Sequence, residues 1–228
     1  MATYITGDPH GSTARIAVFC SGKNLSEDDI LVLLGDVGAN YFLDFRDLSM
    51  KEELNALGPE MLCIHGNHEA RPWHMLGCTT KEWHGGIVYY EEEFPHVLYA
   101  KDGEIYRLEG KACMAIGGAY SVDRQIRLAR GWHWFPDEQP SDEIKAYVEE
   151  QLRRHTVDVI FSHTCPADFR PVECFLPGLD QSRVDTSTED WLDQIEKRTG
   201  YETWYCGHWH INKIDQKIHF LLDQWEQL

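Results

Sequence analysis

Residues 61–69, with the sequence MLCIHGNHE, hold a short apolar run that leads directly into a polar turn. The apolar half is short and unbroken, which is typical of a β-strand covered on both faces. The polar half, Gly66-Asn67-His68-Glu69, combines a glycine that permits a tight turn with amide, imidazole and carboxylate groups that bind divalent ions. Ligand sites of α/β sheets assemble at the carboxyl ends of strands. The stretch therefore predicts an α/β protein with a site at the edge of its sheet.

The same arrangement, an apolar run followed at once by a polar cluster, occurs four more times. The clusters are Gly7-Asp8-Pro9-His10-Gly11, Gly35-Asp36-Val37-Gly38, Ser162-His163 and Gly207-His208-Trp209-His210. The pairs Asp8/His10 and His208/His210 are each two positions apart, so both members can project in one direction from an extended chain. Asp36 lies between the two sets and is the natural carboxylate to bridge two ions. Each cluster alone has an ordinary explanation as a turn, a cap or a structural histidine, but their common place after five strands predicts one metal site.

Strand and helix patterns alternate along the rest of the chain. Further strands are predicted over residues 2–6, 30–34, 86–90, 105–108, 112–116, 157–162, 203–206 and 218–222. Helical spacing covers residues 13–20, 42–57, 141–155 and 188–199, with Ser141 as an expected N-cap. Residues 85–118 are rich in strands, which predicts a mixed or second sheet there. Without linkers or repeats, the alternation predicts one α/β domain over residues 1–228.

The composition excludes several classes of protein. A chain of 228 residues with 43% hydrophobic residues can fill a core, and a formal charge of −17 argues against a protein that grips long nucleic acid. No segment approaches the roughly 18 apolar residues of a membrane helix, and no signal peptide is visible. Seven cysteines without a Cys-x-x-Cys pair signal neither a disulfide framework nor a thiolate zinc site. We therefore expect a cytoplasmic protein that does not bind membranes.

The ordered set Asp-x-His, Gly-Asp, Gly-Asn-His-Glu, His and Gly-His-x-His resembles that of the calcineurin-like metallophosphoesterase superfamily. The resemblance spans residues 7–210. It implies a four-layer αββα fold, in which two mixed β-sheets pack as a sandwich flanked by helices, as a single domain over residues 1–228. It implies that one metal ion is held by Asp8, His10, Asp36 and His210, and the other by Asp36, Asn67, His163 and His208.

The resemblance also implies an enzyme. Its reaction would be hydrolysis of a phosphate monoester, on a phosphoprotein or a small phosphorylated metabolite, by in-line attack of a hydroxide that bridges the two metals. Asp36 and His68 would be catalytic, with His68 as an acid or a charge clamp on the phosphate. A nucleotide or cyclic-nucleotide phosphodiesterase is the alternative, and a non-catalytic binding scaffold is a third, less favoured one. Manganese is the first expectation, with Fe, Zn, Co, Ni or Mg as alternatives; the oligomeric state stays open.

One part of the superfamily pattern is missing. Protein Ser/Thr phosphatases follow Gly-Asp with two residues and then Asp-Arg-Gly, whereas this chain continues from Asp36 as Val-Gly-Ala-Asn40. Asn40, Arg71 and Arg124 are therefore the candidates for binding substrate, with Arg127 and Arg130 beyond Arg124. The aromatic segment 131–136, GWHWFP, either lines the substrate pocket or packs over the sheet edge.

Overall fold

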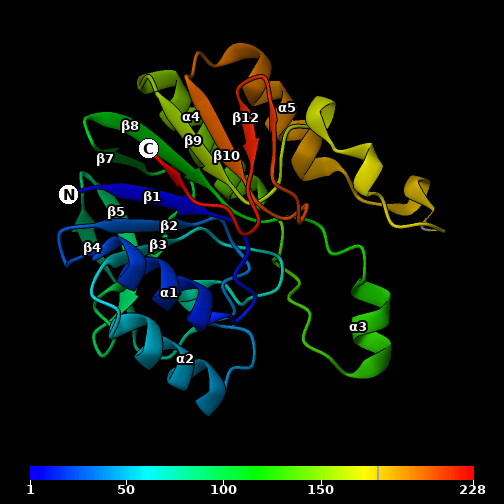
Figure 1. The fold of residues 1–228 in the computed structure, drawn as a ribbon. Coiled ribbons are helices and arrows are strands. Elements are labelled where there is room, and N and C mark those ends of the chain that lie inside the picture. Colours follow the sequence, from blue (N-terminus) through cyan, green and yellow to red (C-terminus); the bar gives the residue numbers. More distant parts are fainter. Residues whose placement is uncertain (179) are drawn as a thin grey trace.

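The computed structural model describes residues 1–178 and 180–228, and its strands form two mixed sheets (Figure 1). The seven-stranded sheet has the order β13-β1-β2-β3-β6-β5-β4, and the six-stranded sheet has the order β11-β12-β10-β9-β8-β7. The strands of the first sheet are β1 (Thr3–Thr6), β2 (Ile30–Leu33), β3 (Glu60–Cys63), β4 (Cys78–Trp83), β5 (Gly86–Glu91), β6 (Val97–Ala100) and β13 (Glu226–Gln227). The strands of the second are β7 (Ile105–Leu108), β8 (Lys111–Ile116), β9 (Val159–Ser162), β10 (Thr203–Cys206), β11 (Lys213–Asp215) and β12 (Ile218–Phe220).

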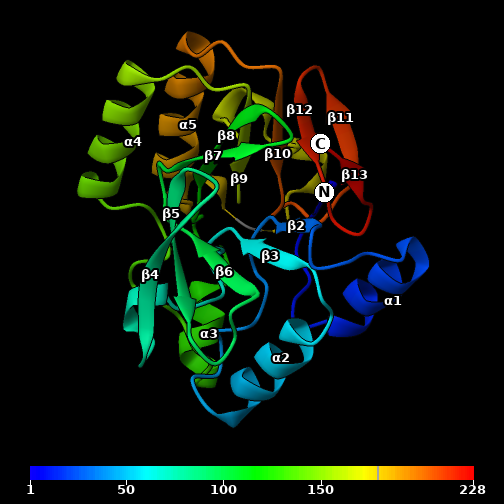
Figure 2. The same cartoon turned by 90° about the vertical axis from the view of Figure 1, so that its left-hand side faces the viewer.

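Helices cover the outer face of each sheet. The α-helices are α1 (Thr13–Lys23), α2 (Phe45–Asn55), α3 (Arg124–Arg130), α4 (Asp142–Arg154) and α5 (Ser187–Arg198), and short 3-10 turns span Pro72–His74, Ala167–Phe169, Val172–Cys174 and Gln181–Arg183. Figure 2 shows α1 and α2 beside the first sheet and α4 and α5 beside the second, on opposite sides of the molecule. Helix α3 packs on neither sheet and extends from the body in Figure 1. The described helices include none that is long and apolar enough to cross a membrane.

Three apolar cores separate the four layers. The central core lies between the sheets and joins residues such as Val32 and Leu62 to Val159 and Phe161. The outward faces of the same strands pack against the helices in the other two cores. Because both faces of each sheet are covered, the central strands are apolar throughout rather than alternating. The expected αββα sandwich of two mixed sheets is confirmed.

The central strands run parallel, which fixes where the polar clusters meet. In the first sheet β1 pairs in parallel with β2, β2 with β3, and β3 with β6. In the second sheet β8, β9, β10 and β12 pair in parallel in that order. The carboxyl ends of β1, β2 and β3 therefore lie side by side, and so do those of β9 and β10. All five predicted clusters follow these strands.

The structure also corrects the sequence-based elements. Strand β4 was not predicted because its sequence, CTTKEW, is largely exposed and has no apolar run. Strands β6, β11 and β13 and helix α3 were missed as well. Strands β11 and β13 and helix α3 are only three, two and seven residues long, whereas β6 is a buried apolar run of four residues like the strands that were predicted. The Ser141 cap is confirmed, because its side chain accepts a hydrogen bond from the Ile144 amide. The strand-rich region 85–118 contributes strands to both sheets, with parallel and antiparallel pairs, which agrees with the expected mixed or second sheet.

Candidate metal centre

The loops that follow β1, β2, β3, β9 and β10 bring all seven predicted ligands together. His163 Nε2 lies 2.9 Å from Asn67 Oδ1 and 3.6 Å from Asp36 Oδ1. His208 Nδ1 lies 3.0 Å from the same Asn67 oxygen. Atoms that could bind a metal ion, from loops that follow strands of both sheets, thus surround one point at the edge of the sandwich.

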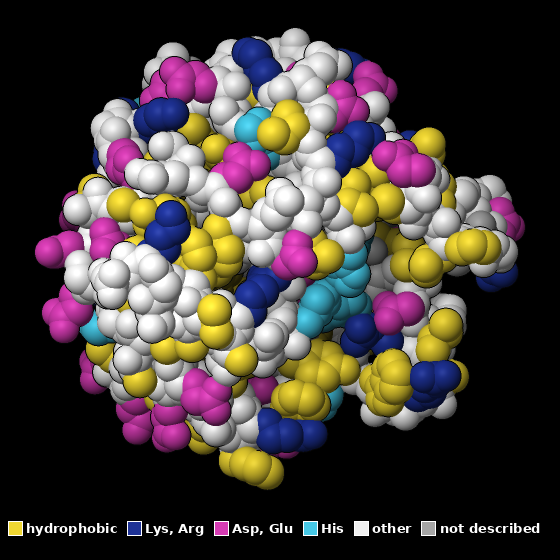
Figure 3. Space-filling view, in the orientation of Figure 1, with side chains coloured by type: hydrophobic (Ala, Val, Ile, Leu, Met, Phe, Trp, Pro, Cys, Tyr) yellow, Lys and Arg dark blue, Asp and Glu magenta, His cyan; other side chains and the backbone are white. Residues whose placement is uncertain are grey.

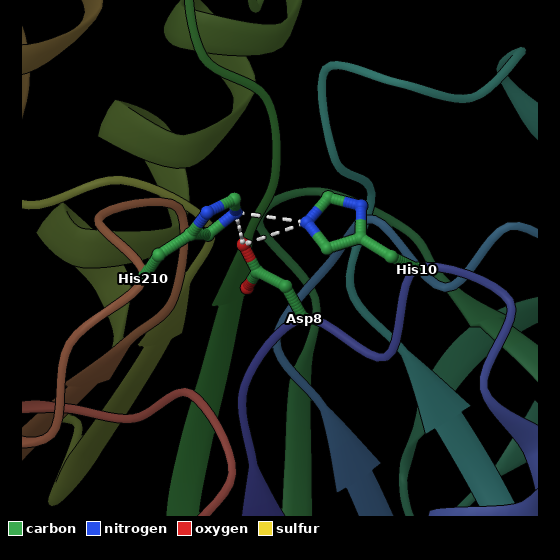
Figure 4. Close-up of side chains that lie close together, drawn as sticks. All are labelled: Asp8, His10 and His210. Atoms are coloured by element: carbon green, nitrogen blue, oxygen red, sulfur yellow. Dashed lines mark hydrogen bonds and ion pairs between the residues drawn. The ribbon is translucent and has the colours of Figure 1, made fainter. Parts of the chain in front are cut away.

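Three further donors form a second group beside the first. Figure 4 shows the side chains of Asp8, His10 and His210 pointing toward one another. His210 Nε2 lies 2.8 Å from His10 Nε2 and 3.5 Å from Asp8 Oδ2. Asp8 also lies within 4.8 Å of the donor atoms of Asp36 and His163, so the two groups are contiguous. Seven donors around two adjacent points suit two ions rather than one.

The two groups differ in exposure. Asp8, Asp36, Asn67 and His163 are buried, whereas the side chains of His10 and His210 are 39% and 55% exposed. On the face drawn in Figure 3, histidine side chains lie in a recess between hydrophobic surfaces. One candidate metal position is therefore deep in the protein, and the other opens toward solvent.

Backbone amides hold the two carboxylates in place. The His208 amide donates to both oxygens of Asp8, at 3.0 and 2.9 Å, and the His68 amide donates to Asp36 Oδ1 at 2.8 Å. Burial opposes ionisation of Asp36, but the charge of the nearby His163 and the hydrogen bond from the His68 amide favour it, and the pKa of Asp36 is lowered to about 2. Asp36 is therefore a carboxylate, the form that binds a metal ion.

The histidines present the nitrogens that a metal needs. His163 Nδ1 donates to the carbonyl oxygen of Leu34 at 2.7 Å, which leaves Nε2 as the nitrogen facing Asn67 and Asp36. Burial, reinforced by His163, holds the pKa of His208 well below its ordinary value. The His208 ring is therefore neutral, which is the ligating form of histidine.

Four of the predicted ligands have left-handed backbone conformations. The φ angles are 46° at His10, 47° at Asp36, 65° at His208 and 52° at His210. Such conformations cost about 1–3 kcal/mol for residues other than glycine and concentrate at functional sites. The fold holds these residues in strained turns that aim their side chains at the centre.

Ser121, a residue that the sequence did not single out as a ligand, orients the Asn67 amide. Asn67 Nδ2 donates to Ser121 Oγ at 2.8 Å, so Oδ1 is the atom that faces His163 and His208. The Ser121 amide donates in turn to Glu138 Oε1 at 3.1 Å. Ser121 belongs to the polar run after β8, and that position was the signal that could have revealed it.

Three glycines let the backbone approach the donor atoms closely. A Cβ on Gly66 would lie 2.1 Å from Asp36 Oδ1, and one on Gly207 would lie 2.1 Å from Asp8 Oδ1. A Cβ on Gly35 would lie 2.2 Å from His163 Nδ1. A side chain at any of these three glycines would therefore overlap a neighbouring side chain. The candidate ligands at the centre are carboxylate, amide and imidazole groups, which divalent transition metals bind. The residues present therefore fit a metal centre.

The predicted substrate-binding residues lie away from the centre. Asn40 is buried in the interior, and Arg71 forms a buried ion pair with Asp102 at 2.5 Å. Arg124 lies over the ring of Trp134, with 3.9 Å between the guanidinium carbon and the ring centroid. Among the described residues, none of these three lines a cavity at the centre. The structure thus does not bring them to the site.

Arg127 is the arginine that reaches the site. Its Nη2 donates to His68 Nε2 at 3.1 Å, and its Nε pairs with Asp123 at 2.8 Å. Burial is the main cause that lowers the pKa of His68, with Arg127 adding to it, and this agrees with a neutral ring that accepts the hydrogen bond. Arg127 lies on α3, whose seven residues are too few to give a helical pattern in the sequence.

The aromatic segment 131–136 packs against the protein instead of lining the site. Trp134 Nε1 donates to Glu138 Oε2 at 2.8 Å, and Phe135 is buried. Trp132 lies at the surface beside Arg130. Of the two roles considered for this segment, the described contacts correspond to packing.

Two cavities meet at the centre. The aromatic cavity, of about 380 Å³, is walled by Tyr120, Val122, Phe175, Leu176, Val184 and Trp209. The α2 cavity, of about 620 Å³, is walled by Gly11, Tyr41, Phe42, Arg46, Met50 and Arg127. Asp36, His68, Asp123 and His210 line both. The centre therefore has two approaches of different chemistry.

Comparisons with known proteins agree with this geometry. A family model of calcineurin-like phosphoesterases matches residues 1–212. The crystal structure of TT1561 of Thermus thermophilus is 11% identical with a TM-score of 0.56, over 99% of this chain and 97% of that one. A second crystal structure is 13% identical with a TM-score of 0.53, over 97% of this chain and 90% of that one. At these identities the likeness shows the fold alone. No curated protein gives a significant match.

Ser121→Ala should weaken metal binding. Without the Ser121 hydroxyl, the Asn67 amide nitrogen keeps only its longer contacts with the His68 ring, of which the shortest is 3.3 Å to Nε2. Loss of such an orienting partner costs about 10- to 100-fold in metal affinity. Calorimetric titration of the apo protein with Mn²⁺ measures the change. Ser182→Ala, at an exposed serine in a 3-10 turn, is the control. An unchanged affinity in Ser121→Ala would show that Asn67 is oriented by other contacts.

Gly66→Ala should remove metal binding, because the added methyl group overlaps the Asp36 carboxylate. Gly22→Ala is the control: Gly22 lies in α1 with no atom within 4 Å of the added Cβ, and the substitution there should be neutral or stabilising by about 0.5–1 kcal/mol. Bound metal per chain and the melting temperature are measured for both. Full metal content in Gly66→Ala would contradict the close approach of the two loops.

Proposed function

This chain belongs to the calcineurin-like phosphoesterase family, and we propose that it hydrolyses phosphate monoesters with two divalent metal ions. Membership of the family implies metal-dependent hydrolysis of phosphoesters. The observation that carries the proposal is the convergence of two contiguous donor groups, linked through Asp8, at the junction of two cavities. The proposal treats residues 1–228 as a single catalytic domain.

We assign the exposed metal to Asp8, His10, Asp36 and His210, and the buried one to Asp36, Asn67, His163 and His208. When bound, a pair of divalent ions supplies Lewis acidity, which neutralises charge on phosphoryl oxygens and lowers the pKa of water. The mixed oxygen and nitrogen donors favour Mn first, with Fe, Zn, Co, Ni or Mg as alternatives.

Arg127 and His68 carry the protein's own part of the reaction. The Arg127 guanidinium is directed at the centre and held by Asp123, so its forked donors can take two phosphoryl oxygens. Once Arg127 binds phosphate, His68 Nε2 loses that hydrogen bond and is free to hold a proton for the departing oxygen. His68 Nε2 lies 3.8 Å from Asp36 Oδ2, close enough to the centre for this role.

A phosphodiesterase is the second candidate, and one observation favours it. Two cavities open onto the same centre, so a diester would have room for one ester group in each. The monoester stays first because Arg127 suits the additional negative charge of a terminal phosphate. A non-catalytic scaffold is disfavoured, since every ligand position of the family pattern is filled.

A cytoplasmic location and a phosphorylated small molecule or protein as substrate are also part of the proposal. All seven cysteines are free thiols, which agrees with a reducing compartment. The cysteines are scattered through the sequence, and none of them belongs to a candidate metal-binding group among the described residues.

The test compares hydrolysis of a chromogenic phosphate monoester and its diester by metal-free protein, by protein reloaded with Mn²⁺, and by two variants. Asp36→Asn should lose both bound metal and activity, because it removes the carboxylate that the proposal assigns to both metal ions. His68→Ala should keep its metal and lose about 10²- to 10⁴-fold in kcat, the usual share of general acid catalysis. Metal content is measured beside turnover in every sample.

His155→Ala, at an exposed histidine after α4, is the matched control and should behave as wild type. Hydrolysis by the metal-free protein, or undiminished turnover in His68→Ala, would overturn the assigned roles. A higher kcat/KM for the diester would favour the second candidate over the first.

A further inference from the structure

The aromatic cavity, one of the two that meet at the metal centre, has walls that the assigned catalytic roles do not use. Its sides are formed by Tyr120, Phe175, Trp209 and three aliphatic side chains that come from separate segments. Phe175 and Trp209 are stacked, with their ring centroids 5.8 Å apart and an interplanar angle of 25°. Most of the exposed surface that lines the cavity is apolar, which is typical of pockets for small organic ligands.

We propose that this cavity binds an uncharged aromatic ring carried by the alcohol part of the substrate. The inference rests on the proposed function, because it concerns the ester group attached to the phosphate at the metal centre. It narrows the substrate class to phosphate esters of aryl-bearing alcohols or of nucleosides, which share the aromatic ring.

Trp209 has the position that such a ring requires. It lies between two predicted ligands, His208 and His210, so a ring packed on it is adjacent to the reacting phosphate. The indole nitrogen is buried on the side of the Cys165 thiol. The side chain therefore offers its carbon surface, and not its donor, to a ligand.

The charges around the cavity argue against a second anionic group on the substrate. Arg170 is the only lysine or arginine among the described lining residues, and it pairs with Glu189 at 3.5 Å. Asp185 accepts hydrogen bonds from the Gln139 side chain and the Ser187 amide. Asp123 is paired with Arg127. With no free cation in the lining that the structure describes, a second phosphate or carboxylate would meet mainly acidic neighbours.

The volume of the cavity agrees with a single ring system. About 380 Å³ lies at the lower end of the range of roughly 300–1,000 Å³ that small-molecule pockets span. Stacking on aromatic side chains tolerates different rings, because every aromatic ring has a π-face. We therefore expect the cavity to favour uncharged aromatic rings in general over one particular ring.

The test uses matched pairs of substrates that differ in the ring but not in the leaving oxygen. One pair is 2-phenylethyl phosphate and propyl phosphate; the other is adenosine 5′-monophosphate and ribose 5-phosphate. The Mn²⁺-loaded enzyme should prefer the aromatic member of at least one pair by about tenfold or more in kcat/KM. A preference in the first pair alone identifies an aryl-bearing alcohol, and one in the second pair alone identifies a nucleoside.

Phe175→Ala and Trp209→Ala should abolish that preference by lowering kcat/KM for the aromatic member about tenfold, with the non-aromatic member unchanged. Phe175 is the cleaner probe, because Trp209 is adjacent to predicted ligands; metal content is therefore measured for both variants. Trp132→Ala removes an exposed tryptophan outside the cavity and should keep the wild-type preference.

Equal kcat/KM values within both pairs, or a preference that survives in Phe175→Ala, would overturn the inference while turnover itself upholds the phosphoesterase. Absence of turnover on all four substrates, with full metal content, would instead overturn the proposed function and this inference with it.

Discussion

Hydrogen bonds at two places join the carboxyl edges of the two sheets, and the rest of the site depends on them. The His208 amide, after β10, donates to Asp8, after β1. His163, after β9, donates to the Leu34 carbonyl, after β2. Each contact connects the seven-stranded sheet to the six-stranded one. Because these four loops carry all the candidate ligands except Asn67, the distance between the sheets at this edge sets the distance between the candidate metal-binding atoms.

The negative charge of the buried carboxylates explains why backbone amides donate hydrogen bonds to them. Asp8 and Asp36 are both buried, and burial of a carboxylate is unfavourable unless hydrogen bonds or opposite charges compensate for it. Backbone amides supply part of that compensation, since they are rigid and cannot turn away. The left-handed turns at His10, Asp36, His208 and His210 add conformational strain to the same few loops. Divalent cations would neutralise the carboxylates, so we expect metal binding to stabilise the folded chain as well as to equip it for hydrolysis.

The surroundings of the centre divide recognition between its two sides. Arg127 extends from α3, a helix that packs on neither sheet, and it meets the centre beside His68. The aromatic cavity is bounded by the loop after β8, the turns of residues 170–176 and 181–185, and the loop after β10. In the proposed function, the phosphate would lie on the polar and charged side, and the ester group on the largely apolar side. With this division, the metal centre would carry out the hydrolysis, and the residues of the aromatic cavity would determine which ester is bound.

The sequence by itself determined the central strands, the layered α/β fold and the polar clusters in which the candidate ligands lie. Those features are local, because an apolar run predicts a buried strand and a parallel sheet brings the clusters that follow its strands to one edge. The tertiary structure alone decided that Arg127, and not Asn40, Arg71 or Arg124, reaches the centre. It also decided that Ser121 orients Asn67, and that Phe175 and Trp209 line the cavity while residues 131–136 pack elsewhere. These outcomes depend on the direction in which each side chain leaves a loop and on contacts between distant segments, which no local pattern specifies.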